Sequence, residues 1–155
     1  MLHYVYRGGV SYGNDFYPGR YALRVMLDLA EHNTGEYITL MDIAQRQNIS
    51  EKYLENIIAA LSKNGFLQTM RGRGGGYKLA RRPELYTVGS ILQVTEGDLV
   101  SVACLEQGAD PCCRSGDCRT LPMWAKLDQL VSDYLESVTL ADLLTKRNDC
   151  NVRDE

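Results

Sequence analysis

The sequence ISEKYLENIIAALSKNGFLQTMRGRGGGYKL, residues 49–79, contains the change of hydrophobic period that decides the fold. Over residues 50–63 the apolar side chains recur every three or four positions, which predicts a helix with one buried face. Ser50 is a favourable N-cap residue, and Asn64-Gly65 supplies a stop signal. Residues 66–70 and 77–80 instead alternate between apolar and polar, so we expect two strands joined by the glycine-rich turn between them.

Two further helices are expected before this stretch. Residues 19–33 carry an apolar stripe at helical spacing, and residues 40–47 form a shorter helix with Thr39 as its N-cap. A turn at Asn48 and Ile49 separates the second helix from the third. The order helix, helix, turn, helix, hairpin is that of a winged helix-turn-helix, so the fold class is mainly α with a small β-hairpin.

In this arrangement the helix after the turn enters the major groove of DNA, and the wing touches the backbone or the minor groove. The side chains that face away from the apolar stripe and could reach base edges are Ser50, Lys52, Glu55 and Asn56. On the wing, Arg71 and Arg73 supply positive charge beside glycines that allow a close approach to DNA. A merely solvated helix face is the alternative interpretation. A nucleotide-binding glycine loop is excluded by its spacing, because Tyr77 stands where a third glycine would be needed.

The charge distribution separates two halves of the chain. The 155 residues carry a net charge of −3, but residues 1–90 hold 11 Lys and Arg against 8 Asp and Glu, while residues 91–155 hold 6 against 12. Six basic residues and no acidic residue lie between Lys63 and Arg82. Such a local basic patch can neutralise phosphates even on an acidic protein.

The acidic half predicts a helix over residues 87–96 and a second helix from about Trp124. The second helix carries an apolar stripe at steps of three and four residues, made of Trp124, Leu127, Val131, Tyr134 and Val138. So wide an apolar face needs a partner, which is either a second chain or the rest of its own chain.

Four of the five cysteines lie between these two helices, in CLEQGADPCCRSGDC at residues 104–118. Glycine and proline make this segment a loop, and thiolates in a loop could bind an ion or a cluster. Zinc held by Cys104, Cys112, Cys113 and Cys118 is one alternative, although paired C-x2-C motifs are missing. A metal-free thiol switch at Cys112 or Cys113 is another, and inert cysteines are the third.

The segments GRYALRVMLDLA (19–30), ISEKYLENIIAALSKNGFL (49–67) and RGRGGGYKL (71–79) together resemble the IscR family of bacterial winged-helix transcriptional regulators, also called the Rrf type. The resemblance continues through LPMW (121–124) and SVTLADLL (137–144). It implies a homodimer that binds a partly symmetric DNA operator, with the 50–63 helix in the major groove and the wing arginines in the minor groove. It also implies that Arg20 contacts a backbone phosphate.

The same resemblance implies that Cys104, Cys112 and Cys118 are ligands of an iron-sulfur cluster, usually [2Fe-2S]. One position departs from the family pattern, because Leu121 stands where the best-known cluster-binding members have a histidine. The fourth ligand would then be Cys113, Glu106, Asp110, Asp117 or a residue of the partner subunit.

These observations divide the chain into an irregular arm (1–18), a winged helix-turn-helix domain (19–86) and a dimerisation and cysteine-loop sensing region (87–155). We expect a cytoplasmic regulator without a membrane segment or enzymatic activity, with a possible protein partner in cysteine or iron-sulfur metabolism. Two other classes remain as alternatives. A thiol redox enzyme lacks a C-x-x-C motif and a histidine base near a cysteine, and a protein-interaction module would use the winged helix without touching DNA.

Overall fold

The computed structural model describes residues 17–110, 112 and 114–145. Its elements are α1 (Tyr17–Glu31), α2 (Leu40–Gln47), α3 (Glu51–Lys63), β1 (Leu67–Met70), β2 (Gly76–Leu79), the 3-10 helix η1 (Pro83–Leu85), α4 (Val88–Glu96), the 3-10 helix η2 (Ala103–Leu105), α5 (Leu121–Ser137) and α6 (Leu140–Thr145). The predicted arm lies outside the described residues except at its end, where α1 already begins at Tyr17. Cys113 and Cys150 also lie outside them.

Side-chain caps fix where the short helices begin. The hydroxyl oxygens of Thr39, Ser50 and Thr87 each accept a hydrogen bond from a backbone N–H in the first turn of α2, α3 and α4, at 3.2, 3.3 and 3.0 Å. This bond satisfies one of the amide groups that a helix start leaves without a partner. The helix α2 ends at Gln47, and its C-cap Asn48 adopts the left-handed conformation with φ of 52°. The two helices, the caps and the turn of the helix-turn-helix are therefore confirmed, whereas α1 lies two residues earlier than the predicted 19–33 at both ends.

The wing is an antiparallel hairpin in which Leu67 pairs with Leu79 and Met70 with Gly76. β1 begins one residue later than the predicted 66–70, and β2 is shifted one residue earlier at both ends relative to the predicted 77–80. Ile38 extends the hairpin by a bridge to Tyr77, with two backbone hydrogen bonds of 2.9 and 2.8 Å. A Cβ atom at Gly76 would lie 2.2 Å from the Ile38 carbonyl oxygen, so this close approach of two backbones requires glycine.

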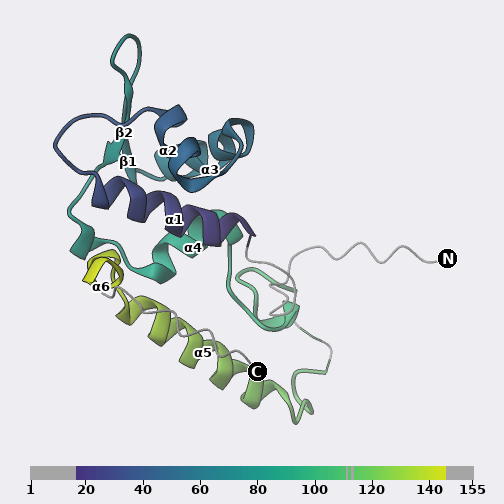
Figure 1. The fold of residues 1–155 in the computed structure, drawn as a ribbon. Coiled ribbons are helices and arrows are strands. Elements are labelled where there is room, and N and C mark those ends of the chain that lie inside the picture. The colour runs from purple at the N-terminus through teal and green to yellow at the C-terminus, as the bar shows by residue number, and fades with distance from the viewer. Residues whose placement is uncertain (1–16, 111, 113, 146–155) are drawn as a thin grey trace, which may run out of the picture.

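A single hydrophobic core lies between α1, α3, α4 and the base of the hairpin. Its fully buried members include Met26 of α1, Leu54 of α3, Ile91 of α4 and Leu140 of α6. Tyr86 closes the core beneath the hairpin, because its hydroxyl donates to the Phe66 carbonyl and accepts from the Arg81 N–H, both at 2.8 Å. In Figure 1 the hairpin projects from one end of this core, and α5 lies at the opposite end.

The expected apolar stripe is longer than the helix that carries it. Trp124, Leu127, Val131 and Tyr134 lie on α5, but Val138 follows its last residue in an extended conformation. The carbonyl of Val138 accepts a hydrogen bond from the Val88 N–H at 2.8 Å, and Thr139 caps α6 through Asp142. The assignment of Val138 to the helix was therefore wrong, because the long-range bond to Val88 and the cap at Thr139 turn the chain into α6. Among the described residues, we find no helix with both the length and the apolarity to cross a bilayer.

Candidate nucleic-acid interface and cysteine loop

The helix α3 turns its polar face outward. Leu54, Ile57, Ile58 and Leu61 are buried in the core, whereas all four predicted base-contact residues are exposed: Ser50, Lys52, Glu55 and Asn56. Ser50 differs from the other three in that its hydroxyl oxygen already accepts the capping hydrogen bond from Tyr53. The hydrophilic face is thus available to a ligand, with Ser50 also holding the helix start.

The wing carries Arg71 and Arg73 on its turn, and both side chains are exposed. Gly72 and Gly74 adopt positive φ angles of 92° and 77°, which allow this tight turn to form. A groove of ≈ 830 Å³ separates the wing from α3, and it is bordered by Glu55 and Ser62 on one side and by Arg71 on the other. The helix face and the wing therefore open onto one shared groove.

Polar contacts join α1 to α2, the first helix of the helix-turn-helix. Asp28 of α1 is buried with 1% of its surface exposed, and both of its carboxylate oxygens accept from the Arg46 guanidinium, at 2.9 and 2.7 Å. Gln47 donates to the same carboxylate at 2.9 Å, and Arg24 of α1 donates to the side chain and the carbonyl of Gln47. Burial alone would raise the pKa of Asp28, but the hydrogen bonds from Arg46 and Gln47 outweigh it and lower that pKa.

Arg20 lies exposed near the start of α1, and its guanidinium lies 5.7 Å from the centre of the Tyr21 ring. Tyr21 meets Tyr53 of α3 edge to face, with ring centres 5.5 Å apart. This aromatic pair connects the second turn of α1 to the first turn of α3. The Arg20 guanidinium thus lies next to the ring that contacts α3.

Sequence reasoning missed Arg24, Asp28 and Tyr53. Asp28 carried a weak signal, since it interrupts the apolar run of residues 25–30, where a lone acid needs a buried partner. Nothing in the sequence identified Arg46 as that partner.

The three predicted cysteine ligands lie in the loop between α4 and α5 (Figure 1). Cys104 is exposed on η2, while Cys112 and Cys118 are half-buried, and none of these three forms a disulfide. Within the described residues, no three His, Cys, Asp or Glu side chains come together in a way that could hold a metal ion. The loop conformation therefore does not fit an iron-sulfur cluster on Cys104, Cys112 and Cys118.

Cys118 stands apart from the other two thiols because it lies just before α5. Hydrogen bonds from the Thr120 hydroxyl and from the backbone amides of Thr120 and Leu121 lower the pKa of this thiol, and the charge of Arg114 adds to the effect. A helix N-terminus commonly favours a thiolate in this way.

The apolar face of α5 is largely uncovered by its own chain. Leu130 is 55% exposed and Tyr134 66%, and no residue of α5 is buried. A contiguous apolar face of this kind is typical of a protein interface.

A winged helix-turn-helix with an outward polar helix, an arginine wing and a long C-terminal helix can be compared with known proteins. The family model of Rrf2, described as an iron-dependent transcriptional regulator, matches residues 18–146. The chain belongs to the Rrf2 family. Rrf2 proteins are DNA-binding transcriptional regulators and not enzymes, so the resemblance to the IscR type, the fold class and the absence of an enzymatic role are confirmed.

Individual relatives agree with this assignment. The transcriptional regulator IscR of Yersinia pseudotuberculosis is 35% identical over 136 residues, which cover 88% of this chain and 82% of that protein. Among solved structures, IscR of T. potens is 34% identical with a TM-score of 0.70, covering 92% of this chain and 93% of that one. CymR, the global cysteine regulator of B. subtilis, is 34% identical with a TM-score of 0.67 and coverages of 84% and 95%. This Rrf2 protein is thus of the IscR and CymR kind.

Proposed function

We propose that this Rrf2 protein is a cytoplasmic homodimer that binds a partly symmetric double-stranded DNA operator. The observation that carries the proposal is the shared groove, which Glu55 of α3 and Arg71 of the wing border from opposite sides. A duplex that takes α3 into its major groove would meet the wing at the adjacent backbone and minor groove.

Each site residue has a distinct role in this proposal. Asn56 and Glu55 reach base edges, where an amide pairs with adenine and a carboxylate accepts from cytosine. Lys52 and Ser50 bind near the start of α3, Arg71 and Arg73 enter the minor groove, and Arg20 contacts a phosphate. The exposure of all seven side chains supports these roles.

The proposal assigns residues 1–18 to an arm, 19–86 to DNA binding and 87–155 to dimerisation and sensing. Ile91 and Leu140 share the core of the DNA-binding part. The boundary at residue 86 therefore divides functions and not separately packed bodies.

DNA titration at several salt concentrations tests the main proposal. The operator is first selected from a random duplex library with the purified protein. We expect Arg73→Ala to weaken binding to every sequence and to reduce the slope of log affinity against log salt by about 1. Lys126→Ala, which removes one exposed positive charge on α5, at the end of the core opposite the hairpin, should leave that slope unchanged. Equal slopes of log affinity against log salt for the two variants would contradict the wing contact. A protein that does not bind DNA would favour the protein-interaction module.

We also propose that the cysteine loop reports iron-sulfur or redox status through Cys104, Cys112 and Cys118. The ligand-like spacing of the cysteines supports this, as does the similarity to proteins named IscR and to a cysteine regulator. A cluster, when bound, would supply a redox-sensitive centre, and the loop would have to adopt another conformation to bind it. A structural zinc, a metal-free thiol switch and a protein partner in cysteine or iron-sulfur metabolism are the alternatives.

Anaerobic purification separates these alternatives. We expect a visible absorption spectrum together with iron and sulfide in the full-length protein, and loss of all three in the Cys104→Ala, Cys112→Ala, Cys118→Ala variant. Zinc alone, lost also on Cys113→Ala, identifies the zinc alternative. A protein without metal whose DNA affinity responds to thiol oxidants identifies the thiol switch.

A further inference from the structure

A side-chain hydrogen bond joins the last residue of α4 to the first turn of α1. The Glu96 Oε1 atom accepts from the Gly19 N–H at 2.6 Å, although the two residues are 77 positions apart in the sequence. The N–H groups of the first turn of a helix have no partner within that helix, and the helix dipole favours a negative charge there. Residues 17–20 include no acid, so the carboxylate at the start of α1 comes from α4.

The packing at Gly19 leaves space for this bond because glycine has no side chain. A Cβ atom at Gly19 would lie 2.7 Å from the Cδ2 atom of Leu92 and 2.9 Å from the Oε1 atom of Glu96. Leu92 is buried, and Glu96 is half-buried one turn further along α4. Any larger residue at position 19 would therefore displace the Leu92 side chain or the Glu96 carboxylate.

Glu96 also lies close to the start of α3. Burial raises the pKa of the Tyr53 phenol, and Tyr21 and the Glu96 carboxylate add to this effect. Tyr21, two residues after Gly19, meets Tyr53 edge to face with ring centres 5.5 Å apart. The start of α1, the start of α3 and the end of α4 therefore meet around one carboxylate.

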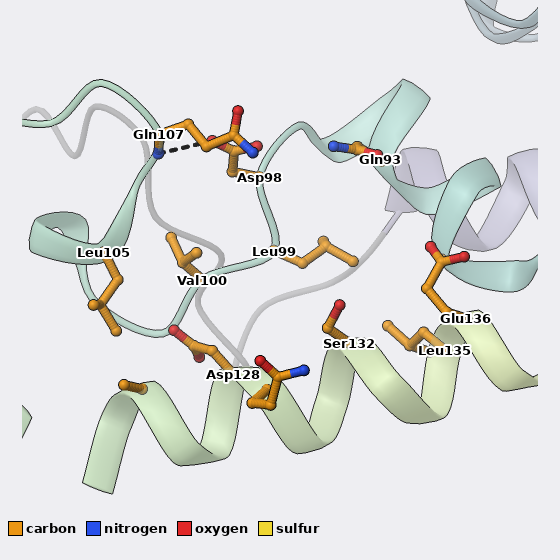
Figure 2. Close-up of a pocket in the computed structure, with 13 residues that line it drawn as sticks. Gln93, Asp98, Leu99, Val100, Leu105, Gln107, Asp128, Ser132, Leu135 and Glu136 are labelled. Carbon is orange, nitrogen blue, oxygen red and sulfur yellow. Dashed lines mark hydrogen bonds between the residues drawn. The ribbon is translucent and has the colours of Figure 1, made fainter. Parts of the chain in front are cut away.

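The end of α4 is held in place from its other side as well. After Glu96 the chain continues into segment 98–107, which passes beside α5 and borders a cavity of ≈ 360 Å³ together with α4 and α5 (Figure 2). Here the Oδ1 atom of Asp128 on α5 accepts from the Ser101 N–H at 2.9 Å. Glu96 thus reaches α1 from a supported position.

The bond bears on DNA binding because Arg20 directly follows Gly19. Arg20 is exposed, and its backbone position depends on how the first turn of α1 is held. Two effects of Glu96 on an approaching duplex are opposed. Its negative charge repels phosphates, whereas its bond to Gly19 orders the backbone beside Arg20 before DNA arrives, which lowers the entropy cost of binding.

We propose that Glu96 is a positioning residue for DNA binding, which holds the first turn of α1 so that Arg20 meets a backbone phosphate. The inference rests on the phosphate contact proposed above for Arg20. The Glu96 carboxylate itself touches no DNA. Through it, region 87–155 takes part in operator binding as well as in dimerisation and sensing.

Titration of the selected operator with the full-length protein at several salt concentrations tests the proposal. We expect Glu96→Ala to weaken binding at least about fivefold and to reduce the slope of log affinity against log salt by about 1, as Arg20→Ala does. If only the charge of Glu96 mattered, Glu96→Ala would strengthen binding, because it removes a repulsion from the phosphates. Glu96→Gln keeps an oxygen that can accept from the Gly19 N–H, so its affinity should stay within about twofold of the wild type.

A double variant and a second single variant separate positioning from a loss of folding. In the Arg20→Ala background, Glu96→Ala should change the affinity by less than about twofold, because the residue that it positions is gone. Gly19→Ala displaces the Glu96 carboxylate without changing the net charge, so it should weaken binding as Glu96→Ala does, and it takes the place of that variant if Glu96→Ala does not fold. The matched control is Glu84→Ala, which removes one exposed acid on η1 and should not weaken binding.

The outcomes distinguish this proposal from the proposed function. The positioning role is overturned if Glu96→Ala binds as tightly as the wild type or more tightly, if its effect persists in the Arg20→Ala background, or if Glu96→Gln is as weak as Glu96→Ala. If Arg20→Ala binds as the wild type does while Arg73→Ala is weakened, the role of Glu96 fails and operator binding stands. A wild-type protein that binds no DNA overturns both.

Discussion

At the scale of single residues, α3 separates side chains that hold the helix from those that face solvent. The hydroxyl oxygen of Ser50 is engaged in the N-cap, whereas Asn56 projects from the exposed face six residues further on. We predict that Asn56→Ala lowers discrimination at one A·T position of each half-site by about 1–3 kcal/mol. Competition binding with operators substituted one base pair at a time measures this.

Lys52→Ala is the informative comparison for that prediction. A lost phosphate contact lowers affinity for all operators alike, while a lost base contact lowers it only where the base matters. Because Asn56 is exposed, its replacement should change the free energy of unfolding by less than about 0.5 kcal/mol. If Asn56→Ala weakened every operator equally, its assignment to a base edge would be wrong.

How far single residues can be predicted depends on whether their role is local. The exposed face of α3 follows from helical period alone, since the apolar stripe leaves Lys52, Glu55 and Asn56 on the other side. The contact between Tyr21 and Tyr53 could not be predicted, because it depends on how two helices cross. The same holds for the pairing of Asp28 with Arg46.

At the scale of elements, the hydrogen-bonded ion pair of Asp28 and Arg46 joins α1 to α2. We predict that Asp28→Asn destabilises the protein by about 1.5–3 kcal/mol at neutral pH, because it leaves the Arg46 guanidinium without its carboxylate. Urea unfolding of both proteins measures the difference. Asp133→Asn, at an exposed position of α5, should change stability by less than about 0.5 kcal/mol.

The pH dependence of this difference follows from the lowered pKa of Asp28. Its ordinary value is 3.8, and hydrogen bonds from Arg46 and Gln47, with the nearby charges of Arg46 and His32, hold the folded value lower. A lowered pKa gives stability that is present above the unfolded value and lost as the pH falls through the folded value. The gap between wild type and Asp28→Asn should therefore be constant from about pH 5 to 8 and shrink below about pH 4. A gap that persists at pH 2 would contradict the ion pair as its source.

Element boundaries could be predicted where a cap marks them. Thr39 and Ser50 are N-cap residues in the sequence and in the structure, and α2 and α3 begin directly after them as expected. The end of α5 has no such mark, since the apolar period continues through Val138 while the backbone leaves the helix. That departure is set by the Val88 N–H, fifty residues earlier in the chain.

At the scale of the whole molecule, the cysteine loop shows where sequence reasoning ends. Its spacing suggests a ligand set, but a loop without hydrophobic period gives no information on where its thiols lie in space. The structure does not gather the described thiols. The cavity between α4 and α5 was equally hidden, because its lining comes from three segments that only the tertiary fold brings together.

The exposed apolar face of α5 leads to the last prediction, which concerns the assembly. If a second chain covers this face, Leu130→Glu places a charge in the interface on both sides. Each lost leucine contributes about 1.5–3 kcal/mol when buried, so the dimer dissociation constant should rise by at least roughly 100-fold. Leu85→Glu is the matched control, because Leu85 is 59% exposed on η1 and Leu130 is 55% exposed. Light scattering after size-exclusion chromatography should give a dimer for wild type and Leu85→Glu and a folded monomer for Leu130→Glu. A monomeric wild type would contradict the proposed homodimer on a partly symmetric operator. A Leu130→Glu variant that dimerises with an unchanged dissociation constant would show that α5 is not the interface.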